Sequence, residues 1–163
     1  MKPQLFLAGL LASLVGTSVH AQTQIVACDL IDQRTAAALL SASIRQHTPN
    51  RQTQVYEGAT LSTCVFFAER SRLVVQLQDY ASKAEAKRAF SATTAPGGAA
   101  SFSSEPRLGE AAAWWKMGTE GYGFVVQAGN RILSVDTRWM DSNSGAGLKD
   151  KLRPVVEAAT RRL

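Results

Sequence analysis

The chain has 163 residues, and its 18 Lys and Arg exceed its 13 Asp and Glu to give a formal net charge of +5. The cations, mostly arginine, are scattered along the chain rather than gathered in a block. This distribution is typical of a solvated surface and argues against a nucleic-acid-binding protein, although it is compatible with a weak attraction to anionic surfaces.

Residues 1–21 have the three parts of a secretory signal peptide. A single charge, Lys2, precedes an uncharged apolar run from Leu5 to Gly16, and small polar residues then lead to Ala21. The run is too short to span a bilayer comfortably, and it lacks the polar face of a helix that packs on a domain. We therefore expect cleavage after Ala21 and export to the periplasm or beyond. The mature part, 22–163, fits a single domain without a transmembrane segment.

Cys28 and Cys64 are the two cysteines of the chain. In an oxidising compartment two cysteines of a small domain usually pair, and closing a loop of about 37 residues stabilises the fold by about 4 kcal/mol in the chain-entropy treatment. Two alternatives stay open. A redox pair lacks the C-x-x-C spacing of such sites. Lipidation of Cys28 has some support from a lipobox-like run at 25–28, but residues 22–24 separate that run from the apolar segment.

Local patterns predict the elements of the first half of the mature domain. The expected elements are a helix 33–43 capped by Asp32, an extended segment near 52–56, strands 60–68 and 71–80, a helix from 83 to about 92, and a Ser-rich loop 93–106. Leu73, Val75 and Leu77 alternate with more polar residues, as in a half-buried strand. Ser82 and Glu85 have the spacing of a capping box.

The second half repeats this order of hairpin and helix. The expected elements are strands 111–117, 122–127 and 131–139, turns at 118–121 and 128–130, a loop at 141–145, and a final amphipathic helix that Pro154 either kinks or delays. Hairpins make antiparallel sheet, and helices with one apolar stripe need a sheet to cover. The sequence therefore predicts an α+β fold, an antiparallel sheet packed by helices in a two-layer sandwich.

Short motifs over most of the mature chain resemble the small exported actinobacterial envelope proteins of the DUF3558 type. The matching stretches are Cys28–Asp32 with Ala36–Leu40, Ser62–Phe66, Leu108–Trp114 and the hairpin at Gly129–Arg131. The resemblance implies a disulfide between Cys28 and Cys64 and helices packed on a sheet. It implies no reaction, because that family is largely uncharacterised. The chain departs from many such proteins in lacking a clear lipobox.

Residues suited to catalysis or metal binding are sparse. His47, beside an expected loop, is the one histidine after the predicted signal peptide, so neither a hydrolytic triad nor a zinc site is indicated, and no cofactor is expected. Gly118, Gly121 and Gly123 match no nucleotide-binding fingerprint and are better explained as positive-φ turn positions. Asp136, close to Arg138 at the end of a hairpin, is expected to be a solvated strand charge.

The pair Trp114-Trp115 is the main candidate for a binding surface. Neighbours on a strand point to opposite faces, so both rings are buried if helices cover both faces of the sheet. The alternative is that one ring stays exposed and forms a stacking platform with nearby aromatic and cationic side chains. The other members of this candidate surface are Tyr122, Arg131, Arg138 and Trp139.

These observations favour a non-catalytic binding or accessory protein of the cell envelope, whose partner is an envelope protein or another envelope component. Two other classes stay open: a small secreted enzyme with a carboxylate- and arginine-based site, and a secreted inhibitor or immunity-type protein that presents the loop 93–106. A pocket converging on Asp136, Arg138 and Tyr122 favours an enzyme or a small-ligand binder. A flat apolar patch around Trp114 or Trp115 favours a protein partner.

Overall fold

The computed structural model describes residues 25–163 except 57, 98–99, 118–120 and 140–146, and it describes the backbone alone for 46–54, 56, 117 and 139. The predicted signal peptide, the predicted loop 141–145 and most of the predicted turn 118–121 therefore lie outside the described residues.

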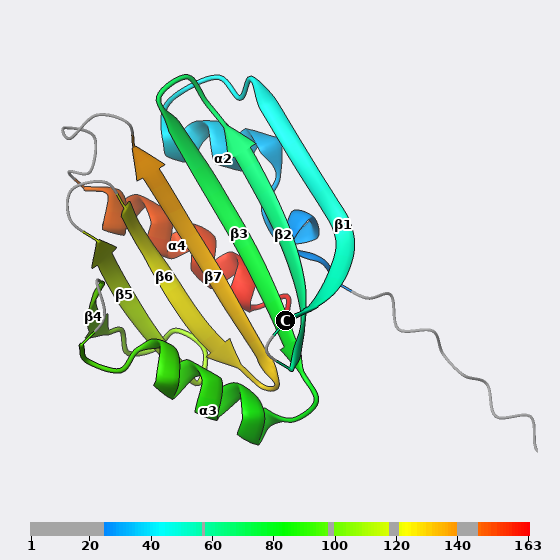
Figure 1. Cartoon of the computed structure of the whole chain (residues 1–163). Helices are drawn as coiled ribbons and strands as arrows, with labels where there is room; N and C mark the ends of the chain where they lie inside the picture. The colour runs from blue at the N-terminus through cyan, green and yellow to red at the C-terminus, as the bar shows by residue number, and fades with distance from the viewer. Residues whose placement is uncertain (1–24, 57, 98–99, 118–120, 140–146) are drawn as a thin grey trace, which may run out of the picture.

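A seven-stranded antiparallel sheet forms the centre of the molecule, with the strand order β1-β2-β3-β7-β6-β5-β4 (Figure 1). The strands are β1 (Gln46–Tyr56), β2 (Ala59–Phe67), β3 (Ser71–Tyr80), β4 (Ser101–Ser104), β5 (Ala111–Met117), β6 (Gly121–Ala128) and β7 (Arg131–Trp139). The helices are α1 (Ala27–Leu30), α2 (Gln33–Leu40), α3 (Lys83–Thr93) and α4 (Leu148–Thr160). The predicted α+β class, with an antiparallel sheet of hairpins packed by helices, is confirmed.

Local capping explains where α2 and α3 begin. The Asp32 carboxylate accepts a hydrogen bond from the Thr35 N–H at 2.7 Å, and the Ser82 hydroxyl accepts one from the Glu85 N–H at 3.2 Å. Helix α2 ends at Leu40, earlier than the predicted residue 43, because Ser41 takes a left-handed conformation (φ 49°). Its N–H then bonds back to the preceding turn, which closes the helix.

Helices α1, α2 and α4 pack on one face of the sheet, which we call the covered face (Figure 1). The alternating residues of the central strands, including Leu73, Val75, Phe124 and Leu133, are fully buried there. Leu152 and Val156 of α4 are equally buried against them. Helix α4 starts at Leu148 and continues through Pro154, so of the two predicted effects of this proline, a kink or a late start, the late start does not occur.

Helix α3 lies on the opposite face of the sheet, near one end of β3, β7 and β6 (Figure 1). Ala86 and Phe90 pack there on Val125 and Ile132, whose neighbours in sequence face the other helices. Among the described residues no other helix covers this side, which we call the open face. The sequence pattern predicted helices on the sheet but did not show that they divide unequally between its faces.

The disulfide joins Cys28 in α1 to Cys64 in β2. Cys64 is fully buried in the core of the covered face. The predicted disulfide is therefore confirmed, and it ties the N-terminal helix to the sheet.

Two segments are more extended than expected. Part of the predicted loop 93–106 is β4, a short strand that pairs with β5. His47 lies within the edge strand β1 rather than beside a loop, and β1 also contains Pro49. Proline is tolerated in an edge strand, because a missing N–H donor on the outer side breaks no ladder.

Candidate ligand-binding site on the open face of the sheet

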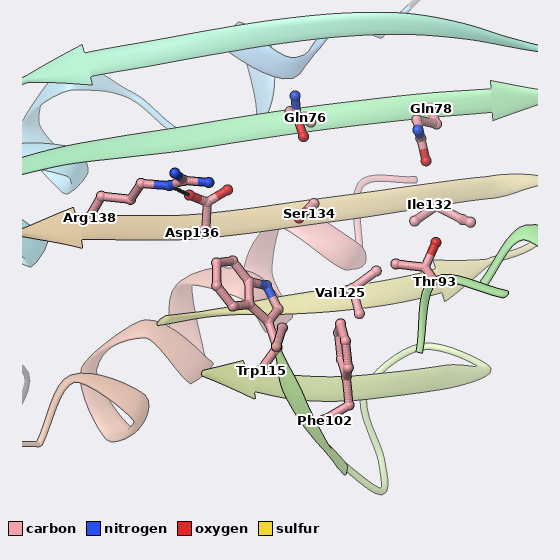
Figure 2. A pocket seen from close by; sticks show the side chains of 11 residues that line it. Gln76, Gln78, Thr93, Phe102, Trp115, Val125, Ile132, Ser134, Asp136 and Arg138 are labelled. Atoms are coloured by element: carbon pink, nitrogen blue, oxygen red, sulfur yellow. Dashed lines mark ion pairs between the residues drawn. The ribbon is translucent and has the colours of Figure 1, made fainter. Parts of the chain in front are cut away.

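A hollow of about 320 Å³ lies on the open face, beside the region that α3 covers (Figure 2). We call it the open-face site. Its lining comes from β3, β7, β6, β5, β4, the last residue of α3 and the segment after α3: Gln76, Gln78, Thr93, Ala100, Phe102, Trp115, Val125, Ile132, Ser134, Asp136 and Arg138. Strand alternation explains this set, because these strand residues occupy the positions between those buried on the covered face.

The site has an aromatic side and a polar side. Phe102 and Trp115 are direct cross-strand partners on β4 and β5, and both rings are partly exposed. Polar side chains of β3 and β7 lie across from them (Figure 2). Gln76 of β3 is the register partner of Ser134 of β7, so their side chains form one row across the two strands. A ligand in the hollow meets a flat apolar surface on one side and hydrogen-bonding groups on the other.

Gly123 makes room for the Trp115 ring. It lies inside β6, opposite Trp115 on one side and Asp136 on the other, and its φ is not positive. A Cβ at this position would lie 2.7 Å from the indole nitrogen of Trp115 and 2.8 Å from the Cβ of Asp136. The prediction that this glycine serves a positive-φ turn is therefore wrong. Its role is to leave space for an aromatic side chain over the strand.

Asp136 is the buried charge of the site. It is 7% exposed, and its Oδ1 has no hydrogen-bond partner among the described residues. The nearest guanidinium nitrogen, Nε of Arg138, is 3.7 Å from Oδ1 (Figure 2). Burial raises the pKa of Asp136 from 3.8 to about 6, although Arg138 and Arg72 act in the opposite direction. The expectation of a solvated strand charge is wrong, because the neighbouring strands and the Trp115 ring shield the carboxylate.

The structure divides the predicted binding surface between the two faces. Trp115 and Arg138 line the open-face site. Trp114 points to the covered face, where its ring stacks near Tyr122 with centroids 6.0 Å apart and meets Phe124 edge-on at 4.9 Å. Neither tryptophan is fully buried, so the prediction that helices bury both rings is wrong. Trp115 stays partly exposed because α3 covers only one end of the open face.

Of the two further residues of the predicted surface, Arg131 does not line the site. Arg131 pairs with Asp79 at 3.1 Å, and it donates a hydrogen bond to the carbonyl oxygen of Leu163 at 3.0 Å. Its role is to hold the end of the chain against the sheet. Trp139 ends β7, and its side chain lies outside the described part of the structure.

Sequence reasoning missed the polar side of the site. The alternation of apolar and polar residues along β3 and β7 indicates that Gln76, Gln78 and Ser134 face away from the core, and the structure agrees. What the sequence did not show is that β3 and β7 pair, because the two strands are separated by a helix and three other strands.

A second buried acid, Glu105, has a structural role. Its carboxylate contacts Lys149 and lies 2.5 Å from Nη1 of Arg153. The other terminal nitrogen of this guanidinium, Nη2, donates to the Pro106 carbonyl at 3.0 Å. Burial opposes ionisation of Glu105, but the hydrogen bonds from Lys149 and Arg153 outweigh burial and lower its pKa. The cluster fastens α4 to the segment after β4.

Within the described residues, no three His, Cys, Asp or Glu side chains gather in a way that could hold a metal ion. No helix in that part of the chain is long and apolar enough to cross a bilayer. Comparisons with protein-family models and with curated proteins found no match.

Proposed function

We propose that this chain is an exported, non-catalytic binding protein of the cell envelope, and that it holds a small ligand in the open-face site. The observation that carries the proposal is the hollow itself, where the partly exposed Trp115 ring faces a polar row and a buried, incompletely partnered carboxylate. Ligand sites commonly combine a concave apolar surface with a few placed polar groups.

Export is the part of the proposal that rests on sequence. The signal-peptide pattern at 1–21 supports it, and the disulfide is in keeping with an oxidising compartment. We also propose membership of the DUF3558-type envelope proteins, on the motifs around Cys28 and Cys64 that resemble them. That resemblance carries no reaction, which agrees with a binding role.

A carboxylate-based enzyme is the second candidate, and one observation favours it. The pKa of Asp136, raised by burial to about 6, suits a general acid or base near neutral pH. However, Asp136 is the only carboxylate that lines the described site, whereas hydrolysis by acid–base chemistry usually needs a pair. The inhibitor hypothesis depended on a protruding 93–106 loop, and β4 within it is instead paired to the sheet.

Equilibrium dialysis tests the proposed function. The exported protein, purified with its disulfide intact, is dialysed against the low-molecular-weight fraction of an envelope extract, and retained compounds are identified by mass spectrometry. We expect the parent and a Gln33→Ala control, which changes an exposed residue of α2, to retain the same compound unaltered. We expect Trp115→Ala to lose it.

Two outcomes would overturn the proposal. Retention of nothing by the parent, or retention that Trp115→Ala leaves unchanged, would remove the open-face site from the function. Chemical conversion of the retained compound, abolished by Asp136→Asn, would instead establish the enzyme.

A further inference from the structure

We propose that the ligand of the open-face site is a neutral carbohydrate, bound with one sugar ring against Trp115. This inference rests on the proposed function and specifies the chemistry of its ligand. Three properties of the site lead to it: the shape of the aromatic side, the hydrogen-bonding capacity of the polar side, and the balance of charge around Asp136.

The aromatic side offers a flat surface, and its one polar group, the indole N–H of Trp115, lies at the edge of the ring. The Trp115 ring lies over Gly123, where the absence of a Cβ lets it approach the strand, and Phe102 is its direct cross-strand neighbour. A pyranose ring has a face of C–H groups that matches such a surface. Stacking buries apolar area on both partners and leaves the hydroxyl groups at the ring edge free to reach polar side chains.

The polar side consists of groups that both donate and accept. Gln76, Gln78 and Ser134 each carry a donor and an acceptor, and they lie across the hollow from the aromatic rings (Figure 2). Sugar hydroxyls also donate and accept, so neighbouring hydroxyls can satisfy such a row. A hydrocarbon or lipid chain would desolvate these groups and offer them no hydrogen bond, although Oε1 of Gln78 already accepts one from the Tyr80 hydroxyl at 3.4 Å.

The charges around Asp136 favour a ligand hydroxyl over a ligand ammonium group at this position. Asp136 lines the hollow, and its buried Oδ1 has no hydrogen-bond partner among the described residues. Arg138 and Arg72 are direct cross-strand partners, and both act on Asp136 electrostatically. A ligand cation there would meet two like charges, whereas a neutral hydroxyl donates to the carboxylate without that repulsion. An anionic group at this position would carry no proton that the Asp136 carboxylate could accept.

The size of the hollow sets the length of the bound unit. Small-molecule sites commonly have volumes of about 300–1,000 Å³, and the open-face site, at about 320 Å³, lies at the lower end. This is room for about one or two sugar rings, so the rest of a longer oligosaccharide would extend along the open face.

Calorimetric titration with defined sugars tests the inference. The probes are glucose, galactose, mannose and N-acetylglucosamine with their disaccharides, together with glucosamine as a cationic match and glucuronate as an anionic one. We expect at least one neutral probe to bind, and to bind at least tenfold more tightly than its charged match. Trp115→Ala should weaken binding at least tenfold. Gln76→Ala, which keeps the aromatic side intact, should weaken it several-fold, and Gln33→Ala should leave it within twofold.

The dialysis experiment distinguishes failure of the carbohydrate inference from failure of the proposed function. If no neutral sugar binds, or if glucosamine binds more tightly than its neutral match, the carbohydrate inference is overturned. The proposed function then stands if dialysis still yields a Trp115-dependent compound, and it falls too if dialysis yields none. Circular dichroism of each variant establishes that lost binding does not come from unfolding.

Discussion

The covered and open faces of the sheet are built by the same strands but carry different chemistry. On β7, Leu133 and Val135 face the helices and are fully buried in an apolar core. Ser134 and Asp136, one residue away from them, line the hollow on the other side. Alternation along one strand thus gives its two sides different chemistry. The larger apolar core lies on the covered face and a smaller one lies under α3, so the rest of the open face can carry polar and aromatic groups.

The largest effect is expected from a core residue of the covered face. Phe124→Ala removes a fully buried ring that packs on Trp114, and we expect a loss of about 3–5 kcal/mol in the free energy of unfolding. Gln76→Ala, on the open face of a neighbouring strand, should change it by less than about 0.5 kcal/mol. Urea denaturation measures both. Equal losses in the free energy of unfolding would show that the two faces contribute equally to stability.

A smaller and pH-dependent effect is expected at Asp136. Its folded pKa is raised from 3.8 to about 6, so the folded state holds this proton more tightly than the unfolded state does. The contribution of protonated Asp136 to the stability of the folded state is fully present below about pH 4, and it is lost as the pH rises through about 6. The shift corresponds to roughly 3 kcal/mol at 1.36 kcal/mol for each pKa unit.

Asp136→Asn should therefore be more stable than the parent at pH 7.5 by up to about 3 kcal/mol, and similar to it at pH 3.5. Urea denaturation at the two pH values measures the difference. Gln33→Ala, at an exposed residue of α2 that carries no titratable group, is the control and should show no such pH dependence. A stability difference that is the same at both pH values would contradict the account of a buried, ionised carboxylate.

The smallest effect is expected at the edge of the sheet. Val55 of β1 is 86% exposed, so it has no buried contact to lose. Val55→Thr keeps the β-branched shape, and we expect a change of less than about 0.5 kcal/mol in the free energy of unfolding. Thermal unfolding measures it. A loss above about 1 kcal/mol would show that the packed region extends to this edge.

Local signals were enough to predict most of the covered face. Asp32 and Ser82 cap their helices as expected, and the alternation of Leu73 and Val75 identified which side of β3 is buried. These patterns depend on neighbours a few residues away. Strand β4 was missed because its Ser-rich sequence, 101–104, has little β-propensity of its own, and it becomes a strand through its pairing with β5.

The open-face site depends on contacts that no local pattern contains. Asp136 is shielded by Trp115 of β5 and by strands that lie far from it in sequence, so its burial could not be predicted from its neighbours. Gly123 looked like a turn glycine because only the position of the Trp115 ring reveals its purpose. The pairing of β3 with β7, which places Gln76 beside Ser134, could not be predicted from the sequence of either strand.

The pairing of β3 with β7 also joins two groups of strands, which we call units. Strands β1 to β3 are consecutive, as are β4 to β7, so each group can form from contacts between neighbours in the chain. The two groups join in the sheet only along the ladder between β3 and β7. Because Gln76 comes from one unit and Ser134 from the other, the open-face site is complete only after the units dock. A ligand that bridges this join binds the docked state alone, and by mass action it adds about 2.7 kcal/mol to the stability of that state at a hundredfold excess over its Kd.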